Sequence, residues 1–313
     1  MYLMGIYPTM AINNRAGFGS LLRLSFVEMK NNDPLRMAGA TAFFTSFALP
    51  PILIILFQVF SLFLNRRLVG TEMVQVLKDT FGEEGARQIR LTTRGFRTIA
   101  TNWYIATGGF VFLVFVATTL FTVIKNSLND IWMIQVKERP GFIFYLKTRG
   151  RSILVILLAG MLFLASLFLD GLQVLAGSYL EKLLFGASDF LMLLLSKITG
   201  VIVVAAWFIL LFRYLADARP PWKVAILGGC LTGVLFTLGK ALLSYIMVRS
   251  NVNSIYGASG SLVLLLLFVF YSSFILYYGA SFIKVYSEVK GKPLRPDAHA
   301  FQYELQELKS EPQ

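Results

Sequence analysis

Residues 250–282 contain no charged side chain, and this stretch constrains the fold more than any other part of the sequence. Its second part, residues 262–282, consists mainly of large apolar side chains. An α-helix rises about 1.5 Å per residue, so about 20 such residues cross a hydrocarbon core of roughly 30 Å. Backbone N–H and C=O groups in lipid must be bonded within the segment. We therefore predict a membrane-spanning helix here.

Five other apolar runs repeat this pattern. The chain is 56% hydrophobic and only 15% charged, whereas soluble domains carry about 25% charged residues. We therefore predict an all-α polytopic membrane protein, a six-transmembrane-helix bundle with a small extracytoplasmic helical cap. The predicted spans are approximately residues 38–64, 104–124, 153–169, 190–212, 224–247 and 262–282.

The segments outside the spans divide the chain into three parts. Residues 1–37 form an N-terminal segment in which Phe18, Leu21, Leu22, Phe26 and Met29 recur at helical spacing. This spacing predicts an interfacial amphipathic helix, although a loose polar tail is an alternative. The membrane domain covers residues 38–286 and includes the outer cap, residues 65–103. A cytoplasmic tail, residues 287–313, follows it.

The distribution of positive charge indicates the orientation of the chain. The net charge is +12, which could suggest a nucleic-acid partner, but the Lys and Arg residues lie mainly between the apolar runs. Eighteen of the 29 basic residues lie on the side of the predicted membrane that holds both termini. Because basic residues accumulate on the cytoplasmic side, both termini are expected in the cytoplasm. The expected surroundings are the lipid bilayer, with no nucleic acid.

Two lysines within predicted spans are candidates for a ligand site, because charges within the bilayer are costly and often functional. Lys197 and Lys240 are predicted to lie at similar depth below the outer surface. They could pair with acidic neighbours, bind an anionic lipid headgroup, or simply extend to the interface as snorkelling anchors. The candidate anionic-ligand or ion-pair site consists of Lys197, Lys240, Arg249, Tyr256, Asp170 and Asp189.

Proline and glycine residues predict where helices bend and where they pack closely. Pro50 and Pro51 are expected to kink or break the first span, because proline removes a backbone donor and crowds the preceding turn. Small residues allow helices to approach closely in a membrane. The predicted close contacts involve Gly229, Gly233, Gly257 and Gly260.

The sequence carries no recognisable catalytic or cofactor motif. His299 is the only histidine and Cys230 the only cysteine, so neither a histidine-rich metal site nor an intrachain disulfide can form. No phosphate-binding glycine loop or metalloprotease motif is present. We therefore expect a protein that is not an enzyme and needs no cofactor or metal.

Several short segments resemble the YihY/BrkB family. They are residues 129–132 (NDIW), residues 212–222 (FRYLADARPPW) and residues 255–260 (IYGASG). The resemblance covers roughly residues 20–290, and its motif residues here are Asn129, Trp132, Arg213, Tyr214 and Trp222. It implies a six-span protein of the bacterial inner membrane with cytoplasmic termini and no established biochemical activity. An old ribonuclease label for the family finds no support in this sequence, which offers no carboxylate or histidine cluster for catalytic metals.

One departure from the family pattern concerns the end of the sixth span. Relatives often place an acidic residue after a Gly-Ala pair, whereas here Gly279 and Ala280 are followed by Ser281. Two functions are compatible with the sequence. The first is transport or handling of a lipid or other amphiphile for the cell envelope. The second is a structural or accessory role with other envelope proteins. A lipid-sized cavity open to one leaflet favours the first.

Overall fold

The computed structural model of the chain describes residues 17–62, 103–137, 188–249 and 260–304, together with parts of 65–91 and 146–169. Six helices in the described part are long and apolar enough to cross a membrane. This confirms the predicted all-α, multi-pass membrane protein. The apolar segments are Pro34–Phe60, Gly108–Ile131, Arg149–Ser166, Leu194–Tyr214, Trp222–Leu243 and Val263–Val289.

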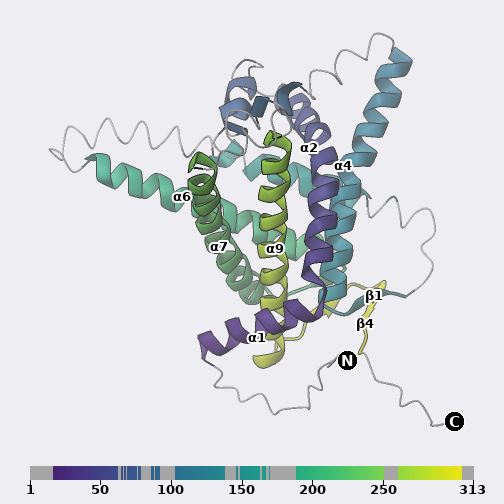
Figure 1. Cartoon of the computed structure of the whole chain (residues 1–313). Coiled ribbons are helices and arrows are strands. Elements are labelled where there is room, and N and C mark those ends of the chain that lie inside the picture. Colours follow the sequence, from purple (N-terminus) through teal and green to yellow (C-terminus); the bar gives the residue numbers. More distant parts are fainter. Residues whose placement is uncertain are drawn as a thin grey trace.

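Most of the long helices stand side by side, one of them, labelled α6, runs obliquely across the bundle, and a shorter helix crosses one end (Figure 1). The crossing helix is α1, Phe18–Asn31. Two short β-ribbons lie at the same end, and we call it the strand-bearing end. The long helices are α2 (Pro34–Phe60), α4 (Trp103–Ile131), α6 (Ser188–Tyr214), α7 (Trp222–Arg249) and α9 (Gly260–Val289). The strands are β1 (Ile134–Val136), β2 (Ala218–Arg219), β3 (Arg295–Pro296) and β4 (Ala300–Gln302).

Helix α9 packs against α1, α2, α4 and α7, which explains why it is apolar around most of its circumference. Its Tyr277 is fully buried, and the phenol oxygen lies 2.5 Å from the hydroxyl of Thr41 on α2. The indole nitrogen of the buried Trp132 donates a hydrogen bond of 3.0 Å to the carbonyl of Ala280. These bonds matter because an unpaired polar group in an apolar interior costs about 1–3 kcal/mol.

Glycine permits close contact between α7 and its neighbours. A Cβ atom added to Gly229 would lie 2.3 Å from Cγ1 of Ile209 on α6, and one added to Gly233 would lie 2.8 Å from Cα of Ala205. On the side of α7 that faces α9, a Cβ added to Gly228 would lie 2.3 Å from Cγ1 of Ile283. Because no larger side chain fits at these separations, the glycines set how closely the three helices approach.

The N-terminal helix buries a different set of residues from the predicted apolar stripe. Leu21 and Met29 are buried, but Phe18 and Phe26 remain more than half exposed. Glu28 is buried instead, and its carboxylate lies 2.6 Å from the Nζ atom of Lys284 on α9. Charge pairing therefore joins apolar burial in orienting α1 against α9.

Two helices extend beyond their predicted ends. Helix α4 continues past residue 124 to Ile131, and α9 continues past residue 282 to Val289. The predicted spans end at residues 124 and 282, just before the first lysines that follow, Lys125 and Lys284. Both lysines are buried and paired with a carboxylate, so neither marks the start of a loop. Helix α2 is also uninterrupted, because its helical conformation continues through Pro50 and Pro51.

The segment after α9 folds back onto the end of the bundle. Strand β3 pairs antiparallel with β2, and β4 pairs antiparallel with β1. Residues up to 304 of the predicted 287–313 tail are therefore structured by pairing with loops distant in the sequence. At the opposite end, Leu77, Ala86 and Ile89 of the predicted cap are buried against residues of α2, α7 and α9.

Candidate functional site at the strand-bearing end

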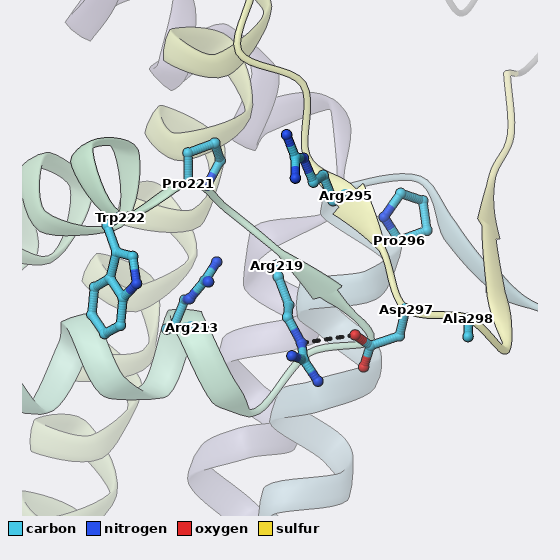
Figure 2. Close-up of a pocket in the computed structure, with 8 residues that line it drawn as sticks. All are labelled: Arg213, Arg219, Pro221, Trp222, Arg295, Pro296, Asp297 and Ala298. Atoms are coloured by element: carbon cyan, nitrogen blue, oxygen red, sulfur yellow. Dashed lines mark ion pairs between the residues drawn. The ribbon is translucent and has the colours of Figure 1, made fainter.

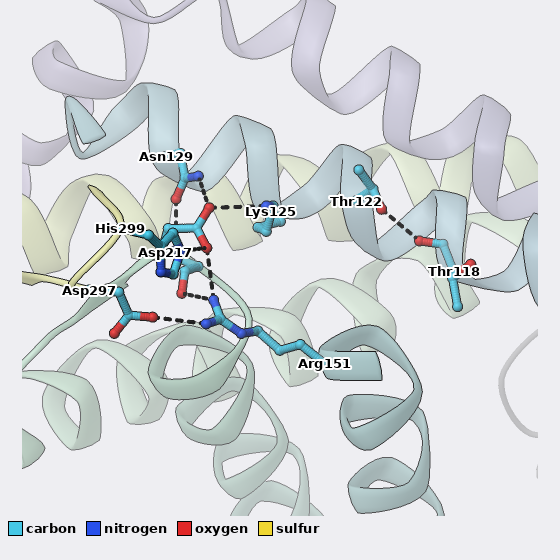
Figure 3. A network of polar contacts seen from close by, with 9 residues as sticks. Thr118, Thr122, Lys125, Asn129, Arg151, Asp217, Asp297 and His299 are labelled. Atoms are coloured by element: carbon cyan, nitrogen blue, oxygen red, sulfur yellow. Dashed lines mark hydrogen bonds and ion pairs between the residues drawn. The ribbon is translucent and has the colours of Figure 1, made fainter. Parts of the chain in front are cut away.

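A buried carboxylate organises the loop between α6 and α7. The side chain of Asp217 is only 2% exposed, and its oxygens lie 3.0 Å from Nζ of Lys125 and 2.8 Å from a guanidinium nitrogen of Arg151. Asn129 on α4 donates a 2.8 Å hydrogen bond to the carboxylate and accepts a 2.9 Å bond from the backbone N–H of Asp217. The loop is thus fixed to two transmembrane helices (Figure 3).

A second carboxylate extends this arrangement to the C-terminal ribbon. Asp297 lies 2.8 Å from Arg151 and 2.9 Å from Arg219, and its backbone N–H donates a 2.9 Å hydrogen bond to the carbonyl of Asp217. The Nε2 atom of His299 lies 3.2 Å from the Asp217 carboxylate. We call this set the Asp217 network; its members are Lys125, Asn129, Arg151, Asp217, Arg219, Asp297 and His299.

The environment of Asp217 favours its ionised form. Burial by itself raises the pKa of this carboxyl group. The charge of Lys125 and hydrogen bonds from Asn129, Lys125 and His299 outweigh the burial, and the pKa is held below its usual value. The network therefore contains a permanent negative charge at neutral pH, and the basic partners are held by charge as well as by geometry.

Three side chains of this network have the donor types of a metal site. One ligand atom each from Asp217, Asp297 and His299 can be chosen so that all lie within 4.8 Å of one another. However, Lys125, Arg151 and Arg219 already contact these carboxylates at 3.0 Å or less. Positive charges at that distance repel a divalent cation. The arrangement is that of an ion-pair network.

A basic pocket lies beside the network, where α6 ends and α7 begins. Its volume is approximately 630 Å³, and it opens between the α6–α7 loop and β3 (Figure 2). Three arginines, one tryptophan and one carboxylate contribute its polar and aromatic lining. We call it the basic pocket; it is lined by Arg213, Arg219, Pro221, Trp222, Arg295, Pro296, Asp297 and Ala298.

The arginines of the basic pocket differ in their contacts. The guanidinium carbon of Arg213 lies 5.1 Å from the centre of the Trp222 ring, and the guanidinium donates a hydrogen bond to the carbonyl of Pro220. Arg219 is paired with Asp297. Within the described part of the chain, no carboxylate lies within ion-pair distance of Arg213 or Arg295. The pocket therefore retains an excess of positive charge.

The pocket lies where the fourth apolar segment ends and the fifth begins. Trp222 is the first residue of the fifth membrane segment, and Tyr214 is the last residue of the fourth. Their rings pack edge to face with centres 6.4 Å apart, and 48% of Trp222 is exposed. Tryptophan and tyrosine concentrate at the level of lipid headgroups. A ligand in the basic pocket would thus lie at headgroup depth.

Comparison with known proteins shows the family to which this chain is related. The family model described as Virulence factor BrkB matches residues 25–302. The chain belongs to the BrkB family. No solved structure shows a significant match to the chain.

Curated relatives of this BrkB-family chain are named only as UPF0761 membrane proteins. One from Teredinibacter turnerae is 28% identical over 273 residues, which cover 86% of this chain and 61% of the relative. One from Haemophilus influenzae is 27% identical over 277 residues, covering 87% of this chain and 96% of the relative. The chain spans about three fifths of the length of the first relatives it matches.

Five residues from two of the three segments that carry the BrkB resemblance gather at the strand-bearing end, whereas residues 255–259 of the third segment lie outside the described part of the chain. Asn129 bonds to Asp217, and Trp132 bonds to the carbonyl of Ala280. Arg213 and Trp222 line the basic pocket, and Tyr214 packs against Trp222. Motifs that are distant in the sequence therefore converge on one region of the molecule.

The lysines proposed from the sequence lie elsewhere. Lys197 is exposed on α6, in a run of exposed residues from 194 to 198, and Lys240 is partly buried on α7. Neither lines the basic pocket. Asp189 and Arg249 belong to α6 and α7, but their side chains lie outside the described part, as do Asp170, Tyr256 and Gly257 altogether. Gly260 is the first residue of α9.

The sequence patterns do not mark Lys125, Arg151, Asp217 or Asp297 as site residues. A signal for the first of these is present in α4, where Thr118, Thr122, Lys125 and Asn129 follow one another at intervals of four, three and four residues. Such spacing places polar side chains on one face of a helix and indicates that the helix continues past residue 124. The two aspartates give no local signal, because their partners are distant in the sequence.

Proposed function

We propose that this membrane protein handles an anionic amphiphile, and that the basic pocket receives the headgroup. The observation that carries the proposal is an arginine-lined pocket beside an exposed tryptophan, at the level where two membrane segments meet. Arginine binds phosphate and carboxylate groups through paired N–H donors. The aromatic ring suits the zone between headgroup and acyl chain.

The exposed surface of α7 supports an amphiphilic ligand over a small water-soluble anion. Side chains at four-residue intervals from the pocket, Trp222, Ile226, Cys230, Val234 and Leu238, are all exposed. They form an apolar stripe that leads from the basic pocket along the membrane segment. An acyl chain attached to a headgroup in the pocket could lie against this stripe, where it would be held by van der Waals packing.

We further propose that the strand-bearing end faces the cytoplasm of a bacterial inner membrane, as the distribution of basic residues suggests. The test uses single cysteines in a background with Cys230 replaced by serine and a membrane-impermeant maleimide. A cysteine at Leu62, which is 80% exposed, should react from outside, whereas one at Phe301, an exposed residue of strand β4, should not. The reverse labelling pattern would invert the topology.

Lipid analysis of the purified protein tests the proposed function. We expect anionic lipid to be enriched relative to the source membrane, and Arg213→Gln/Arg295→Gln to abolish the enrichment. Lys223→Gln is the matched control, because it removes a positive charge at the start of α7 without altering the pocket lining. Lipid at bulk composition in all three proteins would contradict the proposal and favour an accessory role in an envelope complex.

A further inference from the structure

We infer that the basic pocket selects a phosphomonoester headgroup, which is a dianion, over the phosphodiester headgroups of ordinary anionic lipids. The inference rests on the proposed function and specifies its substrate class. It follows from three features of the pocket: its charge balance, the geometry of its donors and the fixed position of its single carboxylate.

The lining residues carry a net charge close to +2. Arg213, Arg219 and Arg295 are cationic, and Asp297 is the only anion among the lining residues. Moreover, Asp297 is shared with Arg151, which lies outside the lining. A phosphomonoester carries a charge of about −1.5 to −2 at neutral pH and has three acceptor oxygens. A phosphodiester carries a single negative charge and leaves about one positive charge of the pocket unbalanced.

The arginine side chains that donate hydrogen bonds come from different structural elements around the pocket. Arg213 is held by its contact with the Trp222 ring and by the carbonyl of Pro220. Arg295 lies on β3, directly paired in register with Arg219 on β2. Figure 2 shows these side chains around one opening. Within the described residues, Arg213 and Arg295 have no carboxylate at ion-pair distance. Because each guanidinium presents several N–H donors in a plane, these two arginines can share the three terminal oxygens of a phosphomonoester.

Asp297 contributes to selectivity by orienting Arg219. Its carboxylate, which is 11% exposed, contacts the Nε atom of Arg219 at 2.9 Å and fixes the guanidinium before a ligand arrives. A preformed donor set loses less conformational entropy on binding. The same carboxylate repels any anion, and a dianion about twice as strongly as a monoanion. The preference for a dianion therefore comes from the net positive charge of the three arginines, which exceeds the single charge of Asp297.

The test compares phosphatidic acid, a phosphomonoester, with phosphatidylglycerol, a phosphodiester, both with identical acyl chains. Binding to the purified protein is measured by native mass spectrometry in a detergent of fixed composition. We expect phosphatidic acid to bind about tenfold more tightly, since a hydrogen bond to a charged group contributes enough for such a difference. Arg295→Gln should remove this preference, and Lys223→Gln should retain it.

A conservative variant separates charge from geometry. Arg295→Lys retains the positive charge but loses the planar donor pair, and we expect it to recover only part of the preference. Arg295 is exposed, so these variants should melt at the wild-type temperature. Equal affinity for the two lipids would overturn the phosphomonoester inference while leaving the proposed function intact. Binding of neither lipid would overturn both.

Discussion

The two ends of the helix bundle hold positive charge in different ways. At the strand-bearing end, Lys125, Arg151 and Lys284 each lie within 3.0 Å of a carboxylate oxygen. Towards the other end, Lys197 lies on α6 with its side chain exposed among apolar neighbours. A lysine facing lipid can extend its charged group to the interface, whereas a buried charge must find a partner within the protein.

This difference shows that a charged residue within an apolar run can be either a buried member of an ion pair or an exposed side chain on the surface of the bundle. The sequence directed attention to Lys197 and Lys240 because they interrupt predicted spans. The structure places the network of ion pairs, the basic pocket and two of the family segments, residues 129–132 and 212–222, at the opposite end. There the charges sit at the ends of helices and were attributed to loops. Three pairs of variants test the contrast, and we order them by the size of the expected effect.

The largest effect is expected from Asp217→Asn. This change removes the negative charge that Lys125 contacts at 3.0 Å and one of the two carboxylate partners of Arg151. Breaking a buried ion pair costs about 3–5 kcal/mol, and we expect the upper end of that range because two pairs are lost. Detergent-micelle unfolding by SDS titration measures the free energy. The control is Asp33→Asn, since Asp33 pairs with Arg36 on the surface, where such pairs contribute about 0–1 kcal/mol.

A double variant distinguishes the loss of this ion pair from a general failure to fold. Lys125→Met/Asp217→Asn removes both partners, so no charge from this pair is left buried alone. It should be more stable than Asp217→Asn by itself if the interaction is direct. Equal stability of the two variants would show that Lys125 and Asp217 are not coupled.

The same substitution at the two ends of the bundle gives the next test. Lys284→Met leaves Glu28 buried without its partner and should cost about 3 kcal/mol. Lys197→Met removes an exposed charge and should change stability very little. The comparison is made in the same micelles by the same titration. A large loss for Lys197→Met would show that Lys197 has a structural partner.

A smaller effect is expected from enlarging the contact between α6 and α7. Gly229→Leu forces side-chain atoms into the backbone of Ile209, and overpacking of this kind costs about 1–3 kcal/mol. The control is Gly200→Leu on α6, because an added Cβ at Gly200 meets no atom within 4 Å. Equal melting temperatures for the two leucine variants would argue against a tight interface at Gly229.

The six membrane helices and the family could be predicted from the sequence because both depend on local patterns. Apolar length defines a span, and short motifs define a resemblance. Helix ends were less predictable, since Lys125 and Lys284 are charged and their burial depends on distant partners. Lys125 and Asp217 are 92 positions apart, and nothing in either neighbourhood specifies their contact.

The basic pocket could not be derived from the sequence for the same reason. Arg213 and Trp222 were identified only as motif residues, and Arg295 was assigned to a tail. Their proximity depends on the pairing of β2 with β3, two strands of two residues each. Such short strands carry no periodic pattern, so only the folded chain brings the third arginine to the pocket.

Photo-crosslinking tests the central claim that the strand-bearing end receives the headgroup. The probe is phosphatidic acid with a photoreactive group near the glycerol backbone, incorporated in vesicles with the full-length protein. Crosslinked peptides are located by mass spectrometry. We predict crosslinks in residues 213–222 and 293–299, with loss of both in Arg213→Gln/Arg295→Gln. Crosslinks concentrated around Lys197 and Lys240, and unaffected by these substitutions, would contradict the account.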